Sequence, residues 1–376
     1  MDKPRILLGL TGSVATTLAP KLVAALEEIG EVKVVVTESA LRTFVKLSEL
    51  REVVDVFTEH EEWAWKYTRE YKGEPQEMWR YEWQKDDPVL HIELRKWADV
   101  FVIAPLTANT LGKMNAGICD NLLTSVFYAW DFTRPVVVAP AMNTHMWKNP
   151  LTFRNLNFLN GLHKGSWHLV PPIKKELACK DEGEGALANI ADIAKATADA
   201  LRWKFPLQNC SGIPINYHPG AFGFQRKHSN HTGVDLYGME NQSVHAVEGG
   251  TVVGVEGFTG PQDDSPWWND TDAVLVEGRS GVVCYGEINP YVKVGQTVRR
   301  GDYVGCLVPV LREGKERADI PGHSRSMLHV ELYKHGTTEA SKSWQQGRKE
   351  LEMTDPTPFL CEAVGSPKER LVWKDG

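Results

Sequence analysis

The feature that most constrains this chain is an alternation of short apolar runs and helical stretches, which continues for about 200 residues and then stops. The stretch at residues 15–29 places apolar side chains at helical spacing, and an Ala-rich stretch at 189–203 closes the region. Such alternation predicts an α/β fold with a doubly wound parallel sheet, whose ligands bind at the carboxyl ends of the strands. The apolar runs lie at residues 5–10, 32–36, 99–104 and 135–139, with a shorter one at 168–170.

The second half of the chain has a different pattern. After Trp203, short β-like runs with frequent glycine follow one another without helical stretches between them. This density of strands predicts an all-β second domain. We therefore expect two domains, 1–206 and 207–376. The clearest strand-like runs lie at residues 249–256, 273–277, 281–286, 303–308 and 328–333.

One segment fits neither pattern. Residues 59–86 are rich in Glu, Lys and Trp. We interpret them as a solvated helical insertion or lid with one amphipathic face.

Composition narrows the class of protein. Of the 376 residues, 42% are hydrophobic and 24% are charged, as in globular proteins. The net charge of −7 argues against a nucleic-acid partner, and no apolar run is long enough for a membrane span. The six cysteines are scattered and the N-terminus lacks a signal-peptide pattern, so we expect reduced thiols and a cytoplasmic protein.

The turn after the first strand, Thr11–Val14, leads into a helical stretch, a place where backbone N–H groups suit a phosphate. A dinucleotide site usually has the full GxGxxG and an acid after the second strand. This chain lacks the GxGxxG motif. After the second strand, residues 37–40 read TESA, so a hydroxyl residue, Thr37, stands first in place of the acid. The sequence therefore argues against NAD as the cofactor, whereas it allows a mononucleotide cofactor.

Four longer motifs carry a family resemblance: DPVLHIELRKWAD (87–99), VIAPLTANTLGKMNAGICDNLL (102–123), APAMNTHMW (139–147) and PPIKKELACKDEGEGALA (171–188). In this order and spacing they resemble the homo-oligomeric flavin-containing cysteine decarboxylases, most closely the eukaryotic phosphopantothenoylcysteine decarboxylases. The resemblance covers residues 4–203. It implies a Rossmann- or flavodoxin-like sheet, FMN as cofactor, 4'-phosphopantothenoylcysteine as substrate, and a homotrimer or higher homo-oligomer.

The resemblance also implies which residues hold the cofactor. The first turn and the end of the second strand would hold the FMN phosphate and ribityl side, and the turn after the strand at 99–104 would hold the cofactor's other face. The expected cofactor-binding residues are Gly12, Ser13, Val14, Thr37, Ser39, Pro105, Thr107, Ala108, Asn109, Thr110, Ala141 and Met142. The alternative for Thr107 is that it is an ordinary helix cap, and both roles can be true.

For the chemistry, the resemblance implies that His91 exchanges a proton near the flavin and that Cys179, on a flap, donates the final proton. Structural alternatives are turn chemistry for Asn143 and a buried thiol for Cys179. Two departures from the family occur: Lys180 stands where a glycine is usual, and Leu187 where a methionine is usual. The expected substrate-binding residues are Asn143, Met146, Lys180 and Asp181.

The second half contains an HxxxD motif and a later LHVELY. Residues 213–360 resemble the lysostaphin-type zinc endopeptidases, which implies zinc ligands His231, Asp235 and His329. The two further active-site histidines of that family are replaced here by Glu287 and Met327. This favours the non-peptidase branch that includes the leukocyte cell-derived chemotaxins, although Glu287 remains a candidate base.

Other functions stay open at this point. The first domain could act on another C-terminal cysteine, or it could be a regulatory flavoprotein that binds a protein phosphatase. The yeast regulators usually carry an acidic C-terminal tail, and residues 367–376 are not acidic overall. A third possibility is a peptidase that the flavin domain merely supports.

Overall fold

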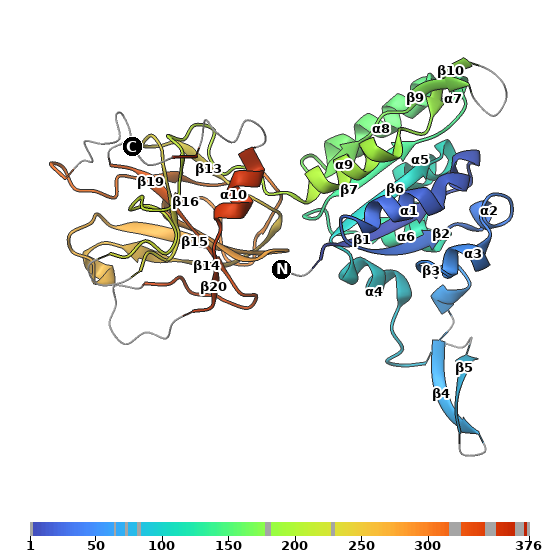
Figure 1. Cartoon of the computed structure of the whole chain (residues 1–376), viewed down its shortest axis with the longest axis horizontal. Coiled ribbons are helices and arrows are strands. Elements are labelled where there is room, and N and C mark those ends of the chain that lie inside the picture. The colour runs from blue at the N-terminus through green and yellow to red at the C-terminus, as the bar shows by residue number, and fades with distance from the viewer. Residues whose placement is uncertain are drawn as a thin grey trace. The chain divides into compact units, whose positions relative to one another are not determined.

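The computed structural model of the protein describes residues 3–63, 65–71, 74–80, 84–176, 182–226, 230–315, 325–342, 351–364 and 372–373. The chain divides into two units, Met1–Leu201 and Arg202–Gly376 (Figure 1). This division falls slightly before the predicted boundary after residue 206, because Trp203 packs in the core of the second unit. Among the described residues, none of the helices combines the length and apolarity that a membrane crossing requires.

The first unit alternates strands and helices along the chain. Its elements are β1 (Arg5–Leu10), the 3-10 turn η1 (Val14–Leu18), α1 (Ala19–Glu27), β2 (Glu31–Val36), α2 (Glu38–Leu41), α3 (Leu47–Arg51), β3 (Asp55–Phe57), the 3-10 turn η2 (Glu61–Trp63), β4 (Trp65–Tyr71), β5 (Glu74–Arg80), α4 (Leu90–Trp97), β6 (Val100–Leu106), α5 (Ala108–Ala116), α6 (Leu122–Tyr128), β7 (Val136–Pro140), α7 (Thr144–Trp147), α8 (Pro150–Leu162), β8 (Trp167–Leu169), β9 (Ile173–Glu176), β10 (Glu182–Ala186) and α9 (Ile190–Leu201).

Six of these strands form one parallel sheet in the order β3-β2-β1-β6-β7-β8 (Figure 1). The predicted parallel sheet is thus confirmed. The order reverses between β1 and β6, and a sheet with such a reversal binds ligands in the crevice at that point.

The sheet is buried on both faces. Leu8 and Val34 face one side, where they pack with Leu22 of α1 in a core that also includes α9. Leu7 and Phe101 belong to the core on the opposite side, with α4, α5, α6 and α8. Because helices cover both faces, the strands are nearly continuous apolar runs, and burial of each aliphatic side chain contributes about 1.5–3 kcal/mol.

The prediction of a helical insertion at residues 59–86 is wrong. After the short turn η2, strands β4 and β5 pair antiparallel as a two-stranded hairpin (Figure 1). Two features of the sequence explain the difference. Trp65, Tyr67 and Tyr71 follow the two-residue spacing of a strand, and Pro75 cannot lie inside a helix.

The second unit is built from strands, as predicted. They are β11 (Ile213–Pro214), β12 (Val234–Tyr237), β13 (Ser243–His245), β14 (Gly250–Thr259), β15 (Thr271–Gly278), β16 (Gly281–Pro290), β17 (Thr297–Val298), β18 (Tyr303–Leu307), β19 (Met327–Tyr333), β20 (Met353–Thr354) and β21 (Val372–Trp373), with one 3-10 turn (Pro261–Asp263) and the helix α10 (Thr357–Val364) among the described residues.

Nine strands of this unit form one sheet, whose main path runs β12-β19-β16-β15-β14-β17. Strands β12 and β19 pair antiparallel in a register that places Asp235 directly opposite His329. A core that includes Val274, Tyr285 and Leu328 lies against the sheet. The sheet pairing therefore brings together two residues that lie far apart in the sequence.

Candidate functional site

Thr11 ties together the two loops that leave the first unit's sheet at its reversal point. Its Oγ1 donates a hydrogen bond to the carbonyl oxygen of Pro105 (2.7 Å) and accepts one from the backbone N–H of Thr107 (3.1 Å). The loop after β1 and the loop after β6 are therefore held at a defined separation, where a doubly wound sheet places its ligand.

A cradle of hydroxyl groups surrounds Gly12. A Cβ atom at Gly12 would come within 2.6 Å of Ser39 Oγ, and Thr37 Oγ1 lies 3.2 Å from that same oxygen. Ser13, the next residue, accepts a hydrogen bond from the N–H of Ala15 (3.2 Å). The structure thus brings Gly12, Thr37 and Ser39 together beside Ser13. A bare glycine backbone with hydroxyl donors suits a phosphate group.

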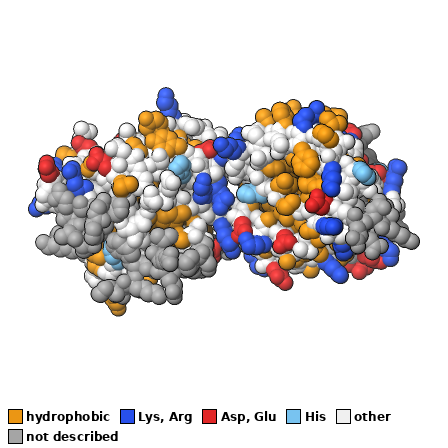
Figure 2. All heavy atoms as spheres, turned by 90° about the horizontal axis from the view of Figure 1, so that it is seen from above, with side chains coloured by type: hydrophobic (Ala, Val, Ile, Leu, Met, Phe, Trp, Pro, Cys, Tyr) orange, Lys and Arg blue, Asp and Glu red, His pale blue; other side chains and the backbone are white. Residues whose placement is uncertain are grey.

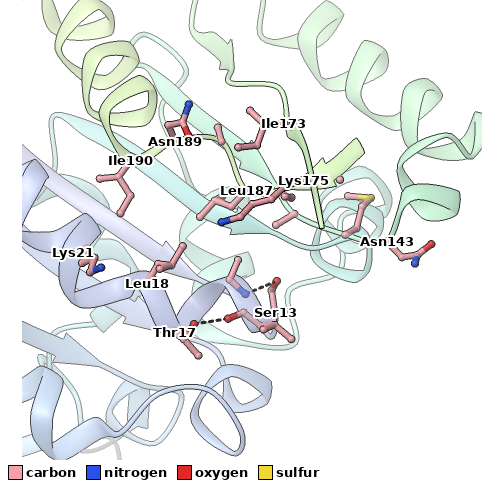
Figure 3. Close-up of a pocket in the computed structure, with 17 residues that line it drawn as sticks. Ser13, Thr17, Leu18, Lys21, Asn143, Ile173, Lys175, Leu187, Asn189 and Ile190 are labelled. Carbon is pink, nitrogen blue, oxygen red and sulfur yellow. Dashed lines mark hydrogen bonds between the residues drawn. The ribbon is translucent and has the colours of Figure 1, made fainter. Parts of the chain in front are cut away.

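A pocket of about 640 Å³ opens at Ser13 (Figure 3). Its walls come from η1 and the start of α1, the loop after β7, strand β9, and the segment from β10 into α9. Five of the residues expected to bind cofactor or substrate line it: Ser13, Val14, Ala141, Met142 and Asn143.

Two lysines line the same pocket and were not among the expected residues. Lys21 comes from α1 and Lys175 from β9, and the Lys175 side chain extends from its strand across the pocket (Figure 3). None of the described residues that line the pocket is acidic. The PPIKKE segment contains two adjacent lysines, but only the strand geometry decides which one faces the pocket.

The other expected cofactor residues lie outside the pocket lining. Thr107 is the N-cap of α5 and accepts a weak hydrogen bond from the N–H of Thr110 (3.4 Å). Met146 on α7 is 46% exposed. Gly12, Thr37, Ser39, Pro105, Thr107, Ala108, Asn109, Thr110 and Met146 are therefore not brought to the pocket wall within one chain.

The hairpin β9–β10 lies against the loop after β7. The N–H of Met142 donates to the carbonyl oxygen of Gly185 (2.9 Å), and Gly185 has φ +146° with no room for a Cβ beside Met142. Glycine is required there because of both the conformation and the close approach. The expected flap residues Cys179, Lys180 and Asp181 lie outside the described residues.

His91 lies in the first turn of α4 and is not part of the pocket wall. Its Nδ1 is 2.7 Å from a carboxylate oxygen of Glu62, a residue that the sequence pattern did not single out.

Comparison with known proteins agrees with these features. Residues 1–202 match the flavoprotein family. Over 187 residues the chain is 50% identical to the phosphopantothenoylcysteine decarboxylase of Arabidopsis thaliana, covering 50% of this chain and 79% of that one. The chain belongs to the flavoprotein family, among the phosphopantothenoylcysteine decarboxylases. The predicted decarboxylase class is therefore confirmed for the first unit.

Two further similarities extend the comparison. The phosphopantothenoylcysteine decarboxylase of Mus musculus is 42% identical over 193 residues, with 51% of this chain and 84% of that one covered. A solved PPC decarboxylase variant complexed with pantothenoylaminoethenethiol is 47% identical; the match covers 52% of this chain and 96% of that chain, with a TM-score of 0.45.

The second unit contains a buried cluster of three potential metal ligands, His231, Asp235 and His329. His231 Nε2 lies 3.2 Å from both His329 Nδ1 and Asp235 Oδ1, and His329 Nδ1 lies 2.8 Å from Asp235 Oδ1. Ligand atoms of a tetrahedral zinc ion lie roughly 3.3 Å apart when each bond is about 2.0–2.1 Å long. The three residues therefore fit a small divalent cation.

Oxygen atoms lie close to the outer atoms of the cluster. His231 Nδ1 lies 2.9 Å from the carbonyl oxygen of Ala221, and His329 Nε2 lies 3.1 Å from Glu331 Oε1. The second oxygen of Asp235 accepts a hydrogen bond from Arg226 (2.9 Å). Metal-bound histidines usually donate their second N–H to a carbonyl or carboxylate, and the contact of His231 with Ala221 is of this kind.

Buried carboxylates, imidazoles and a guanidinium interact closely in the cluster and shift one another's pKa values. Burial alone would raise the pKa of Asp235, but His231, His329 and Arg226 hold it well below its ordinary value. Burial alone would lower the pKa of His329, but the charge of Glu331 and the contacts with Asp235 and Glu331 raise it to about 10. Buried carboxylates around two imidazoles thus favour a bound positive charge.

Glu287 and Met327, the two positions at which the expected resemblance would place further histidines, have different surroundings. Met327 packs against Tyr237 and Val310 in an apolar cluster. Glu287 is buried, and burial, followed by the negative charge of Asp235, raises its pKa to about 8. Met327 offers no proton donor or acceptor for catalysis, and Glu287 holds a proton more tightly than an exposed glutamate does.

Proposed function

We propose that the first unit holds FMN and decarboxylates 4'-phosphopantothenoylcysteine to 4'-phosphopantetheine, a step of coenzyme A biosynthesis, in the cytoplasm. The observation that carries this proposal is the 50% identity to a phosphopantothenoylcysteine decarboxylase over 79% of that relative's length. The cradle at Gly12 supports it, because a glycine, which has no Cβ atom, lets a phosphate oxygen approach the backbone beside the Ser39 hydroxyl.

In this proposal each part of the site has one task. Bound FMN supplies reversible two-electron chemistry at the substrate, which makes loss of carbon dioxide possible. The Gly12 cradle holds the FMN phosphate. Asn143 binds the substrate's carboxylate or amide, His91 accepts and returns a proton, and Cys179 supplies the proton that completes the product. Met146, Lys180 and Asp181 would contact the substrate around these groups.

The pocket lysines support a phosphorylated substrate. Lys21 and Lys175 approach from different walls of a pocket whose described lining has no acidic residue. An ammonium group pairs well with a phosphate monoester, which carries up to two negative charges. We therefore assign the substrate's 4'-phosphate to these two lysines.

We also propose a homotrimer or higher homo-oligomer. Leu151, Phe158 and Leu162 of α8 are each about half exposed, and the first unit presents grouped hydrophobic side chains on the face shown in Figure 2. Apolar side chains gathered in this way favour a protein interface. A second copy would also account for His91 and the Thr107–Thr110 turn, which lie outside the pocket of a single chain. Analytical ultracentrifugation tests this proposal; a monomer that takes up FMN would contradict it.

The deciding experiment is incubation of purified protein with 4'-phosphopantothenoylcysteine, followed by mass analysis. We expect a yellow protein and the loss of carbon dioxide. His91→Asn should retain FMN but lose decarboxylation, and Cys179→Ser should accumulate the oxidised enethiol product. Turnover only of other C-terminal cysteines, or no turnover together with capture of a phosphatase, would favour the alternative functions.

For the second unit we infer one bound zinc ion and no peptidase activity, as in a degenerate lysostaphin-type domain. The observation that favours this is the buried cluster of His231, Asp235 and His329. Peptide cleavage also needs a donor for the developing oxyanion, and Met327 provides none. The test is release of a fluorophore from glycine-rich peptides. Release that is abolished by chelator and by Glu287→Gln would contradict the inference.

A further inference from the structure

Glu62 and His91 form a buried pair, although 29 residues separate them in the sequence. Nδ1 of His91 lies 2.7 Å from Oε1 of Glu62. The Glu62 side chain is 8% exposed, whereas that of His91 is 23% exposed. The carboxylate is therefore enclosed, while part of the imidazole still reaches the surface.

Local interactions hold the turn that carries Glu62, and His91 belongs to a helix. Glu62 lies in η2, whose first residue, Glu61, pairs with Arg51 and accepts a hydrogen bond from the N–H of Thr58 (2.8 Å). His91 is the second residue of α4, which begins at Leu90. The neighbouring contacts of Glu61 therefore anchor the backbone from which the Glu62 side chain reaches His91.

The contact determines which nitrogen of His91 carries a proton. An ionised carboxylate accepts hydrogen bonds and donates none, so the N–H must be on Nδ1. In the neutral imidazole, Nε2 then has a free lone pair. Among the described residues, the His91 ring makes no other hydrogen bond or ion pair than the one with Glu62.

We propose that Glu62 is a positioning residue for the decarboxylation, which fixes His91 in the tautomer that presents Nε2 to the substrate. This rests on the proposed function, because it assumes that His91 exchanges a proton with the substrate. Nε2 accepts that proton, and the Glu62 carboxylate then stabilises the imidazolium that forms. A carboxylate that accepts the N–H of the other ring nitrogen in this way orients the imidazole and stabilises its positive charge.

The test compares two variants of Glu62 with a control on the same helix. Glu62→Gln keeps a carbonyl oxygen that accepts the Nδ1 proton but removes the charge, and Glu62→Ala removes both. Glu93→Gln removes an exposed carboxylate of α4 that pairs with Lys96. We expect kcat to fall about 10-fold for Glu62→Gln and about 100-fold for Glu62→Ala, with KM within about twofold, unchanged FMN content and no change for Glu93→Gln.

A spectroscopic measurement separates positioning from a merely structural role. In ¹⁵N-histidine-labelled protein, with His91 assigned from a His91→Gln sample, we expect the Nδ1–H tautomer in the wild type and Glu62→Gln, and mainly Nε2–H in Glu62→Ala. An unchanged kcat or an unchanged tautomer in a folded, FMN-loaded Glu62→Ala variant would overturn the proposal. If the wild type turns over no substrate, the proposed function fails instead, and the tautomer result still tests the Glu62 contact.

Discussion

The Nε2 atom of His231 lies 3.2 Å from the Nδ1 atom of His329, and the other nitrogen of each ring faces an oxygen acceptor. If both rings donate those outer N–H groups, two nitrogen lone pairs point at each other and at the carboxylate of Asp235. Such an arrangement is repulsive unless a proton or a metal ion lies between them. The contact is therefore consistent with either a proton or a metal ion at this place, and zinc analysis distinguishes the two.

We expect purified protein to retain one zinc ion per chain after dialysis, and His231→Ala to lose it. Glu331→Gln should weaken zinc binding by about 10–100-fold, because Glu331 holds the outer nitrogen of His329. Elemental analysis and competition with a chromophoric chelator measure both effects. Glu277→Gln is the matched control, since Glu277 also contacts a histidine, His335, but at the surface. Equal zinc content in the wild type and His231→Ala would contradict the assignment.

We expect Gly12→Ala to remove FMN from the protein. The added methyl group would come within 2.6 Å of Ser39 Oγ, so it would either displace that hydroxyl or occupy the phosphate position. The flavin absorbance per chain should fall at least about 10-fold, with far-ultraviolet circular dichroism unchanged. Gly112→Ala is the control, because a Cβ at Gly112 meets no atom within 4 Å. Normal flavin content in Gly12→Ala would rule out the cradle as the phosphate site.

We expect Lys175→Ala to weaken recognition of the substrate's phosphate. The Lys175 side chain lies in the pocket wall, so its loss should raise KM for 4'-phosphopantothenoylcysteine about 10-fold or more. KM for pantothenoylcysteine, which lacks the phosphate, should not change. Lys174→Ala is the control, because its neighbouring side chain does not line the pocket. Equal effects of Lys175→Ala on the two substrates would place the phosphate elsewhere.

We expect the second unit to lose stability as the pH rises above 4.5, in part because of Glu248. Burial raises the pKa of this carboxyl above its ordinary value of 4.5. The folded state then binds more protons than the unfolded state between the two pKa values, so the free energy of unfolding falls with rising pH across that window, by at most about 1.4 kcal/mol per pH unit.

Glu248→Gln should flatten this dependence. Glutamine can accept the hydrogen bond from the N–H of Ser280 and donate to its hydroxyl, so both contacts of Glu248 with Ser280 have a replacement. Urea titration of the full chain, followed by hydrogen exchange in β15 and β16, measures the effect. Glu240→Gln removes an exposed carboxylate of the same unit and is the control. An equally steep pH dependence in Glu248→Gln would show that another group is responsible.

The periodicity of apolar residues in the sequence predicted most elements of both units. It does so because the burial of each strand requires apolar residues at regular positions along that strand. Val34 and Val102 lie in parallel strands covered on both faces, and such strands must be apolar throughout. The hairpin of β4 and β5 was not predicted from the sequence, because a charged segment with several aromatic residues can also be interpreted as an amphipathic helix. Pro75 is the residue that argues against a helix there.

What the sequence by itself determined is the class of each unit and the motifs of the first, since these depend on local residue patterns that survive without a structure. Only the tertiary structure decided which side chains meet. The Glu62–His91 contact, the entry of Lys175 into the pocket, and the pairing of Arg226 with Asp235 all join residues from different elements. No local pattern encodes such contacts, because they arise from the register of strands and the packing of turns, which the whole fold sets together.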